Sequence, residues 1–138
     1  MIMRESSQIL LVEDNPGDID LVKEALGQFE TPPQLKVVSN GGAALEILRE
    51  FLPDMILLDL NIPGIDGREV LSAVKQDDRM RHIPVVVLTS SSAERDLIYA
   101  YQCHANCFIT KPGDVEEFFR TFKALEQFWF SVVTLPPR

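Results

Sequence analysis

Four short apolar runs in this chain of 138 residues are each followed directly by side chains that could do chemistry. These side chains are three acids, a threonine and a lysine: Glu13, Asp14, Asp59, Thr89 and Lys111. Three carboxylates held close together repel one another unless a cation lies among them, and such oxygen ligands suit a hard divalent ion. The sequence therefore predicts a Mg2+ site at Glu13, Asp14 and Asp59.

Lys111 and Thr89 supply the two kinds of group that a phosphoryl group needs. An ammonium brings positive charge, and a hydroxyl brings a hydrogen-bond donor for the phosphoryl oxygens. Asp59 is then a candidate nucleophile that forms an acyl phosphate. Each residue alone has an ordinary interpretation, since Asp14 could cap a helix and Lys111 could be a surface lysine. The set as a whole indicates phosphoryl chemistry.

Five strands and five helices are predicted to position these residues. The apolar runs are too short for helices and mostly uninterrupted, as in strands covered on both faces. The predicted strands are 9–12, 35–38, 55–58, 85–88 and 107–109. Segments of helical period alternate with them, and their predicted capping residues are Asn15, Asn40, Asp66, Ser91 or Ser92, and Asp114.

This alternation predicts an α/β fold of the (βα)5 kind. Parallel strands joined by right-handed crossovers form a doubly wound sheet with helices on both faces. Five such strands favour the flavodoxin-like order 2-1-3-4-5, with ligands bound beyond the carboxyl ends of the strands. We expect one domain over residues 1–138, with its core at about 7–130 and a short tail at 131–138.

Composition and charge exclude several classes of function. The formal net charge is −8 at pH 7, and the Lys and Arg residues are scattered, which argues against a nucleic-acid partner. No apolar run is long enough for a membrane span, and the first residues do not resemble a signal peptide. We therefore expect a cytoplasmic protein with no nucleic-acid or membrane partner.

Cys103 and Cys107 do not predict a structural zinc site. The only histidines are His82 and His104, whereas structural zinc takes four Cys or His ligands at characteristic spacing. The two cysteines are better interpreted as reduced thiols at the end of a helix and in a strand, which fits a cytoplasmic location.

Across nearly its whole length, the chain resembles the receiver domain of bacterial two-component response regulators. The resemblance rests on Glu13-Asp14 after the first predicted strand, residues 57–67 around Asp59, Thr89-Ser90, and Lys111-Pro112. It implies that Asp59 accepts a phosphoryl group from a phosphohistidine of a histidine kinase. It also implies a signalling protein that catalyses only its own phosphorylation and dephosphorylation, rather than an enzyme acting on other molecules.

The resemblance further implies how the metal is held. Asp14 and Asp59 would bind Mg2+ directly, the backbone carbonyl of Asn61 would complete the protein ligands, and Glu13 would act through water.

A switch is implied as well. Lys111 would pair with the phosphoryl group, Thr89 would turn its hydroxyl toward it, and Phe108 would move into the space vacated. Many members have Tyr where this chain has Phe108, so the hydroxyl of that aromatic is missing here. Asn61 and Ser91 flank the expected approach of water, and we expect both to influence dephosphorylation. The Lys111–Pro112 bond is expected to be trans, although such bonds can be cis at tight turns.

Within the family, the chain is most similar to the small stand-alone regulators that partner phytochrome-type sensor kinases in cyanobacteria. Residues 13–18, 66–71 and 105–112 carry this likeness. It implies a place downstream of a phytochrome-type light sensor. Gly113 departs from the pattern, because an apolar residue is common there, and this could loosen the start of the last helix.

Apolar side chains in excess of the core predict a homodimer through the fourth helix, the fifth strand, the last helix and the tail. Those left over near the end of the chain are Phe119, Phe128, Phe130, Val132 and Val133, and Tyr99 and Tyr101 lie in the fourth helix. We expect Phe130→Asp to give a monomer. The alternative is that the tail folds back over its own sheet.

Two other functions compete with a phosphorylation switch. A Mg2+-dependent hydrolase with an aspartyl-phosphate intermediate would need an acid where Asn61 stands, and a substrate cap. A flavodoxin-like cofactor protein would need a phosphate-binding loop after the first strand, where residues 13–18 are acidic. A receiver-like interaction module that works without phosphorylation is the alternative that stays open.

Overall fold

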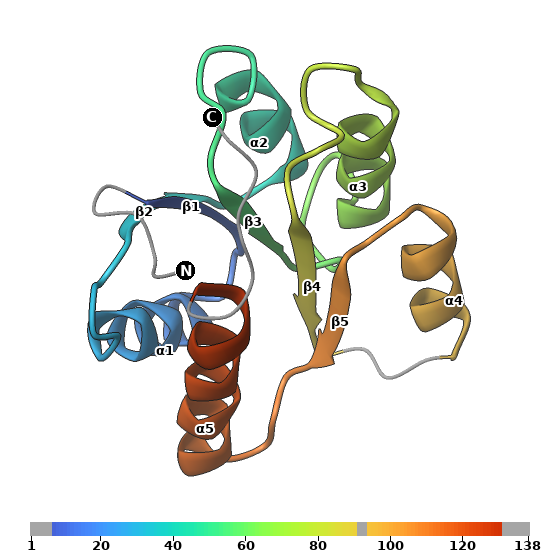
Figure 1. The fold of residues 1–138 in the computed structure, drawn as a ribbon. Helices are drawn as coiled ribbons and strands as arrows, with labels where there is room; N and C mark the ends of the chain where they lie inside the picture. Colours follow the sequence, from blue (N-terminus) through green and yellow to red (C-terminus); the bar gives the residue numbers. More distant parts are fainter. Residues whose placement is uncertain (1–6, 91–93, 131–138) are drawn as a thin grey trace.

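A computed structural model describes residues 7–90 and 94–130, with the side chain of Phe130 left out (Figure 1). Its centre is one parallel sheet in the order β2-β1-β3-β4-β5. The strands are β1 (Gln8–Val12), β2 (Gln34–Val38), β3 (Met55–Leu58), β4 (Val85–Thr89) and β5 (Cys107–Thr110). The predicted strand order is confirmed, and every strand boundary lies within one residue of its predicted position.

Helices cover both faces of this sheet, with α1 and α5 on one face and α2, α3 and α4 on the other (Figure 1). They are α1 (Pro16–Gly27), α2 (Gly41–Ile47), α3 (Gly67–Gln76), α4 (Glu94–Gln102) and α5 (Val115–Leu125). A short π-helical segment, η1 (Glu126–Phe130), continues α5. The doubly wound α/β class is therefore confirmed.

The strand sequences are uninterrupted because each strand feeds two hydrophobic cores. Leu10, Val12, Ile56 and Leu58 pack on the side of α2, α3 and α4. Their neighbours in sequence, among them Leu11 and Leu57, pack on the side of α1 and α5. Successive side chains of a strand point to opposite faces, so a strand buried on both faces has apolar residues throughout.

Side-chain caps open the four helices whose capping residues are described. The oxygens of Asn15, Asn40, Asp66 and Asp114 accept backbone hydrogen bonds, from the N–H groups of Asp18, Ala43, Arg68 and Glu117 respectively. These four predicted caps are confirmed. The fifth, Ser91 or Ser92, lies outside the described residues.

The last helix, α5, begins directly after its capping residue, Asp114. Asp114 directly follows Gly113, and its side chain accepts a hydrogen bond of 2.8 Å from the N–H of Glu117, so Gly113 does not prevent the start of α5. Phe118 and Phe122 stack with ring centroids 5.0 Å apart in the core. Phe119, expected to be left over from the core, is half-buried and packs against the same cluster.

Two further observations bear on sequence expectations. No peptide bond among the described residues is cis, so the Lys111–Pro112 bond is trans. Within the same ranges, no helix has both the length and the apolar character needed to cross a membrane.

Candidate functional site

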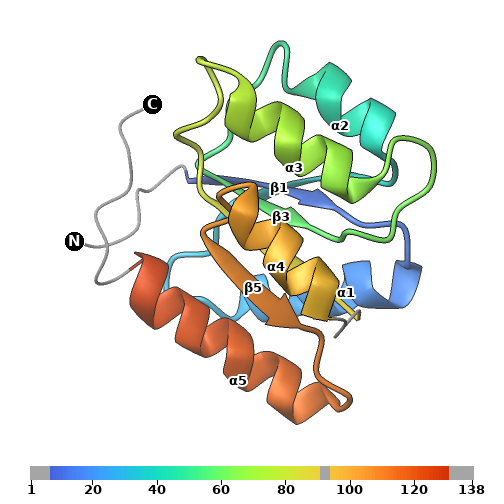
Figure 2. The same cartoon turned by 90° about the vertical axis from the view of Figure 1, so that its right-hand side faces the viewer.

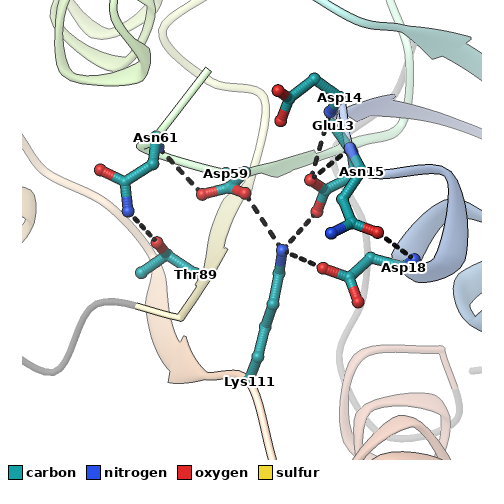
Figure 3. A network of polar contacts seen from close by, with 8 residues as sticks. All are labelled: Glu13, Asp14, Asn15, Asp18, Asp59, Asn61, Thr89 and Lys111. Carbon is teal, nitrogen blue, oxygen red and sulfur yellow. Dashed lines mark hydrogen bonds and ion pairs between the residues drawn. The ribbon is translucent and has the colours of Figure 1, made fainter.

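All predicted site residues except Phe108 gather at the carboxyl ends of β1, β3, β4 and β5 (Figure 3). The parallel register pairs Val12 of β1 with Leu58 of β3. Glu13 and Asp59 follow these paired residues, so both leave the sheet at the same level. The backbone N–H of Asp59 donates to the carbonyl of Val12 at 3.0 Å, which fixes this relationship.

Three carboxylates form an acidic cluster at this edge. One oxygen from each of Glu13, Asp14 and Asp59 lies within 4.8 Å of the others. Glu13 is only 1% exposed and Asp59 5%, whereas Asp14 is exposed to solvent. Within the described ranges, this is the only group of His, Cys, Asp and Glu side chains close enough to share a metal ion. A set of hard oxygen donors with one side open to water fits a divalent cation such as Mg2+ or Mn2+.

Lys111 reaches into the cluster from the end of β5. Its ammonium nitrogen lies 2.6 Å from Glu13 Oε1, 2.7 Å from Asp18 Oδ2 and 3.1 Å from Asp59 Oδ2. Burial by itself would lower the pKa of Lys111, but the hydrogen bonds to Asp18 and Glu13 and the nearby charge of Asp59 outweigh it and leave the pKa raised. The charged form of Lys111 is therefore favoured, and its ammonium faces Asp59.

Glu13 is held from two directions. Its Oε2 accepts hydrogen bonds from the backbone N–H groups of Asp14 and Asn15, both at 3.2 Å, while Oε1 accepts from Lys111. Burial raises the pKa of Glu13 to about 7, the hydrogen bond from Lys111 acts against this shift, and the charge of Asp59 adds to it. A neighbouring cation stabilises the charged form of carboxylates that lie this close together.

Asn61 connects Asp59 to Thr89. Its backbone N–H donates to Asp59 Oδ1 at 2.9 Å, and its side-chain amide donates to Thr89 Oγ1 at 3.3 Å. Thr89 ends β4 and is completely buried. The structure therefore places an ammonium on one side of the Asp59 carboxylate, and a backbone donor with a nearby hydroxyl on the other (Figure 3).

Phe108 lies farther from the cluster than the other predicted residues. It is half-buried in β5, opposite Val87 in the register, and packs against the core on the side of α4. Thr89 is paired instead with Thr110. The two predicted switch residues, Thr89 and Phe108, thus lie on neighbouring strands, and their positions differ by two residues in the strand register.

Asp18 is the one site residue that the sequence analysis missed. Asn15 caps α1, and this places Asp18 in the first turn of the helix, with its carboxylate on Lys111 (Figure 3). An acid three residues after an N-cap is usually interpreted as a response to the helix dipole, so the sequence carries no signal specific to a lysine 93 positions away.

The two cysteines lie outside this site. Cys103 follows α4 and Cys107 begins β5, and both are half-buried free thiols.

Comparisons with known proteins agree with this geometry. The family model of the response regulator receiver domain matches residues 9–123. The chain is 42% identical over 135 residues to response regulator Rcp1 from Synechocystis sp., covering 93% of this chain and 92% of that protein.

Solved structures share the fold over nearly the whole chain. The phosphorylated cyanobacterial phytochrome response regulator RcpA superposes with a TM-score of 0.91 at 43% identity, covering 96% of this chain and 99% of RcpA. The Mn2+-bound form of Rcp1 gives a TM-score of 0.90 at 41% identity, covering 95% and 99% of the two chains. Since the family model, the sequence relatives and the shared backbone all agree, the chain belongs to the family of response regulator receiver domains.

Proposed function

We propose that this protein accepts a phosphoryl group on Asp59 from the phosphohistidine of a sensor histidine kinase and thereby switches a protein-interaction surface. The observation that carries the proposal is the position of the Asp59 carboxylate. One of its oxygens lies 3.1 Å from the ammonium of Lys111, and the other accepts a hydrogen bond from the N–H of Asn61. A buried carboxylate with a cation and a donor beside it is suited to act as a phosphoryl acceptor.

The proposed cofactor is Mg2+. Asp14 and Asp59 would be direct ligands, with the backbone carbonyl of Asn61, and Glu13 would act through water. When bound, the ion would neutralise charge on the phosphoryl oxygens. The acidic cluster supports this, as does the Mn2+-bound form of the relative Rcp1.

The proposed transfer is a displacement at phosphorus. An oxygen of Asp59 forms a bond to phosphorus, the bond from phosphorus to the histidine nitrogen breaks, and that nitrogen keeps the electron pair. Lys111 balances charge on a phosphoryl oxygen, and Thr89, after turning toward the phosphoryl group, donates a hydrogen bond from its hydroxyl. Phe108 then moves toward the space that Thr89 leaves. Water later hydrolyses the acyl phosphate, so the chemistry is confined to this protein's own residue.

A phytochrome-type sensor kinase is the proposed source of the phosphoryl group, in the cytoplasm. Support comes from the likeness to RcpA, which is itself a phytochrome response regulator, at 43% identity. Faster transfer from a phosphorylated phytochrome-type kinase than from an unrelated histidine kinase would support this partner. Equal rates from both would contradict it.

A second copy of this chain is the proposed partner of the face formed by α4, β5 and α5, together with the tail. Figure 2 shows these three elements side by side. Leu97, Ile98 and Tyr101 of α4 are 38%, 48% and 50% exposed, and Phe128 in η1 is 55% exposed. Large apolar side chains exposed on one face are typical of an interface, and the three in α4 support this proposal.

The deciding experiment is intact mass spectrometry after incubation with acetyl phosphate. Wild type and Asp59→Asn are compared, with and without Mg2+. One added phosphoryl group that needs both Mg2+ and Asp59 is the expected result. No adduct on wild type, together with no binding of beryllofluoride, would contradict the proposal and favour an interaction module that works without phosphorylation.

A further inference from the structure

The ammonium of Lys111 has three acceptors, and they come from three different elements (Figure 3). Glu13 follows β1, Asp59 follows β3, and Asp18 lies in the first turn of α1. The contact with Asp18 is 2.7 Å long, shorter than the 3.1 Å contact with Asp59. A lysine ammonium has three N–H donors, so these carboxylates use all of them.

Two of the three acceptors are themselves fixed. Glu13 is 1% exposed and also accepts hydrogen bonds from the backbone N–H groups of Asp14 and Asn15. Asp18 is held by its backbone, because its own N–H donates to the Asn15 side chain at 3.1 Å in the cap of α1. Glu13 and Asp18 therefore act as anchors, and the third N–H of Lys111 is directed at Asp59.

A single anchor would leave the ammonium less well placed. The lysine side chain is long and flexible, and one hydrogen bond does not fix the direction of the other two N–H groups. A second anchor from a different element removes much of this freedom in advance. Placing a charged group before the reaction favours phosphoryl transfer, because no reorganisation is then needed as charge develops.

We propose that Asp18 is a positioning residue, which holds the Lys111 ammonium toward Asp59 and toward the phosphoryl oxygens that form on it. This inference rests on the proposed function of Asp59 as the phosphoryl acceptor. A competing role for Asp18 is that of an acid in the first turn, which stabilises α1 through the helix dipole without any need for Lys111.

The first test observes Lys111 directly and does not require phosphorylation. Side-chain 1H–15N spectra of the ammonium groups are recorded for wild type, Asp18→Ala and Asp18→Asn, with Lys111→Met assigning the signal. Hydrogen exchange of the Lys111 ammonium should be several-fold faster in Asp18→Ala. Asp20→Ala, which removes an exposed acid from the same helix, should leave it unchanged. Equal exchange in wild type and Asp18→Ala would overturn the proposal.

The second test measures the rate of phosphorylation by acetyl phosphate. We expect about a tenfold loss in Asp18→Ala and a smaller loss in Asp18→Asn, which keeps an acceptor oxygen and a nearly identical shape. In a Lys111→Met background, Asp18→Ala should cause no further loss, because residues that act through one another are not additive. A full tenfold loss in that background would show that Asp18 acts independently of Lys111, and would overturn the proposal.

The two tests separate this inference from the proposed function. If wild type gains no phosphoryl group, the proposed function fails, and the ammonium exchange still decides whether Asp18 holds Lys111. If wild type is phosphorylated and Asp18→Ala is phosphorylated at the same rate, the function stands and the positioning role of Asp18 fails.

Discussion

The side-chain amide of Asn61 donates a hydrogen bond to the hydroxyl of Thr89, with nitrogen and oxygen 3.3 Å apart. This contact joins the segment after β3 to the end of β4. The same residue holds Asp59 through its backbone N–H. Asn61 thus contacts the proposed acceptor Asp59 through its main chain and the proposed switch residue Thr89 through its side chain.

Asn61→Ala should make the switch easier to activate. The substitution removes a hydrogen bond that holds Thr89 in its present position. One hydrogen bond contributes about 1 kcal/mol net, which changes an equilibrium constant about fivefold. Beryllofluoride in the presence of Mg2+ should therefore bind about fivefold more tightly, as measured by titration. The gain should vanish in a Thr89→Ala background. Unchanged affinity in the single variant would show that this contact does not bias the switch.

The lifetime of the phosphoryl group should also change in Asn61 variants, since the backbone N–H of Asn61 contacts the acceptor Asp59 and its side chain contacts Thr89. The same expectation for Ser91 concerns a residue outside the described ranges. Identical lifetimes in substitutions at both positions would contradict it.

Gly41→Ala should destabilise the fold by about 2–4 kcal/mol, because a Cβ at this position would overlap the backbone carbonyl of Ile65 in the loop between β3 and α3. Gly27→Ala is the matched control, since a Cβ there meets nothing within 4 Å, and it should stabilise α1 by about 0.5–1 kcal/mol. Urea unfolding of both variants measures the difference. Two variants of equal stability would contradict the close approach at Gly41.

Arg68→Ala should cost about 2 kcal/mol of unfolding free energy. The guanidinium joins α3 to α4 through Asp96, at 2.6 Å, and the side chain of Asp96 is only 7% exposed. Removing the guanidinium takes the ion-pair partner Arg68 away from a carboxylate that has little access to water. The comparison is Arg81→Ala, whose pair with Asp78 is exposed on both sides and should change stability by less than about 0.5 kcal/mol. Similar losses in the two variants would argue against this role of Arg68.

Cys107 should react slowly with iodoacetamide at pH 8. Burial raises the pKa of its thiol, although a hydrogen bond with the backbone of Phe108 acts against the shift, and the thiolate is the reactive form. A Cys103→Ser variant isolates Cys107, and mass spectrometry follows its alkylation between pH 7 and 9.5. A rate equal to that of a small free thiol would contradict a raised pKa.

The same shift has a consequence for stability. Because the folded protein favours the neutral thiol, the contribution of Cys107 is fully present at low pH and is lost as the pH rises through the raised pKa.

Phe128→Asp should convert a dimer into a monomer. It replaces an apolar side chain that is 55% exposed, in the segment η1 that continues α5, by a charged one. Phe130→Asp is expected to do the same. Light scattering coupled to size exclusion measures the mass of each. Lys123→Ala, at an exposed position of α5, is a control that should leave the mass unchanged. A wild-type monomer would contradict the proposed dimer, and unchanged mass in both aspartate variants would place the interface elsewhere.

Local patterns in the sequence determined most of the fold. Uninterrupted apolar runs such as Val85–Leu88 predicted strands that are buried on both faces, and Asn15 and Asp114 predicted helix starts, because a cap depends only on residues within one turn. The alternation of strand and helix predicted parallel strands, and the order was predicted as the usual one for five such strands. The carboxyl ends of parallel strands share one edge, so Glu13, Asp59 and Lys111 could be assigned to one site from their positions alone.

Tertiary structure decided what no local pattern contains. The contact of Asp18 with Lys111 spans 93 residues, and that of Asn61 with Thr89 spans 28, so neither has a signature in its own segment. Phe119 was expected to be left over, yet it is half-buried and packs against the core, because only the packing of α5 against its neighbours determines how wide a stripe of that helix is covered. The sequence by itself determined which groups meet at the edge of the sheet. Side-chain directions and helix packing decided which of them touch.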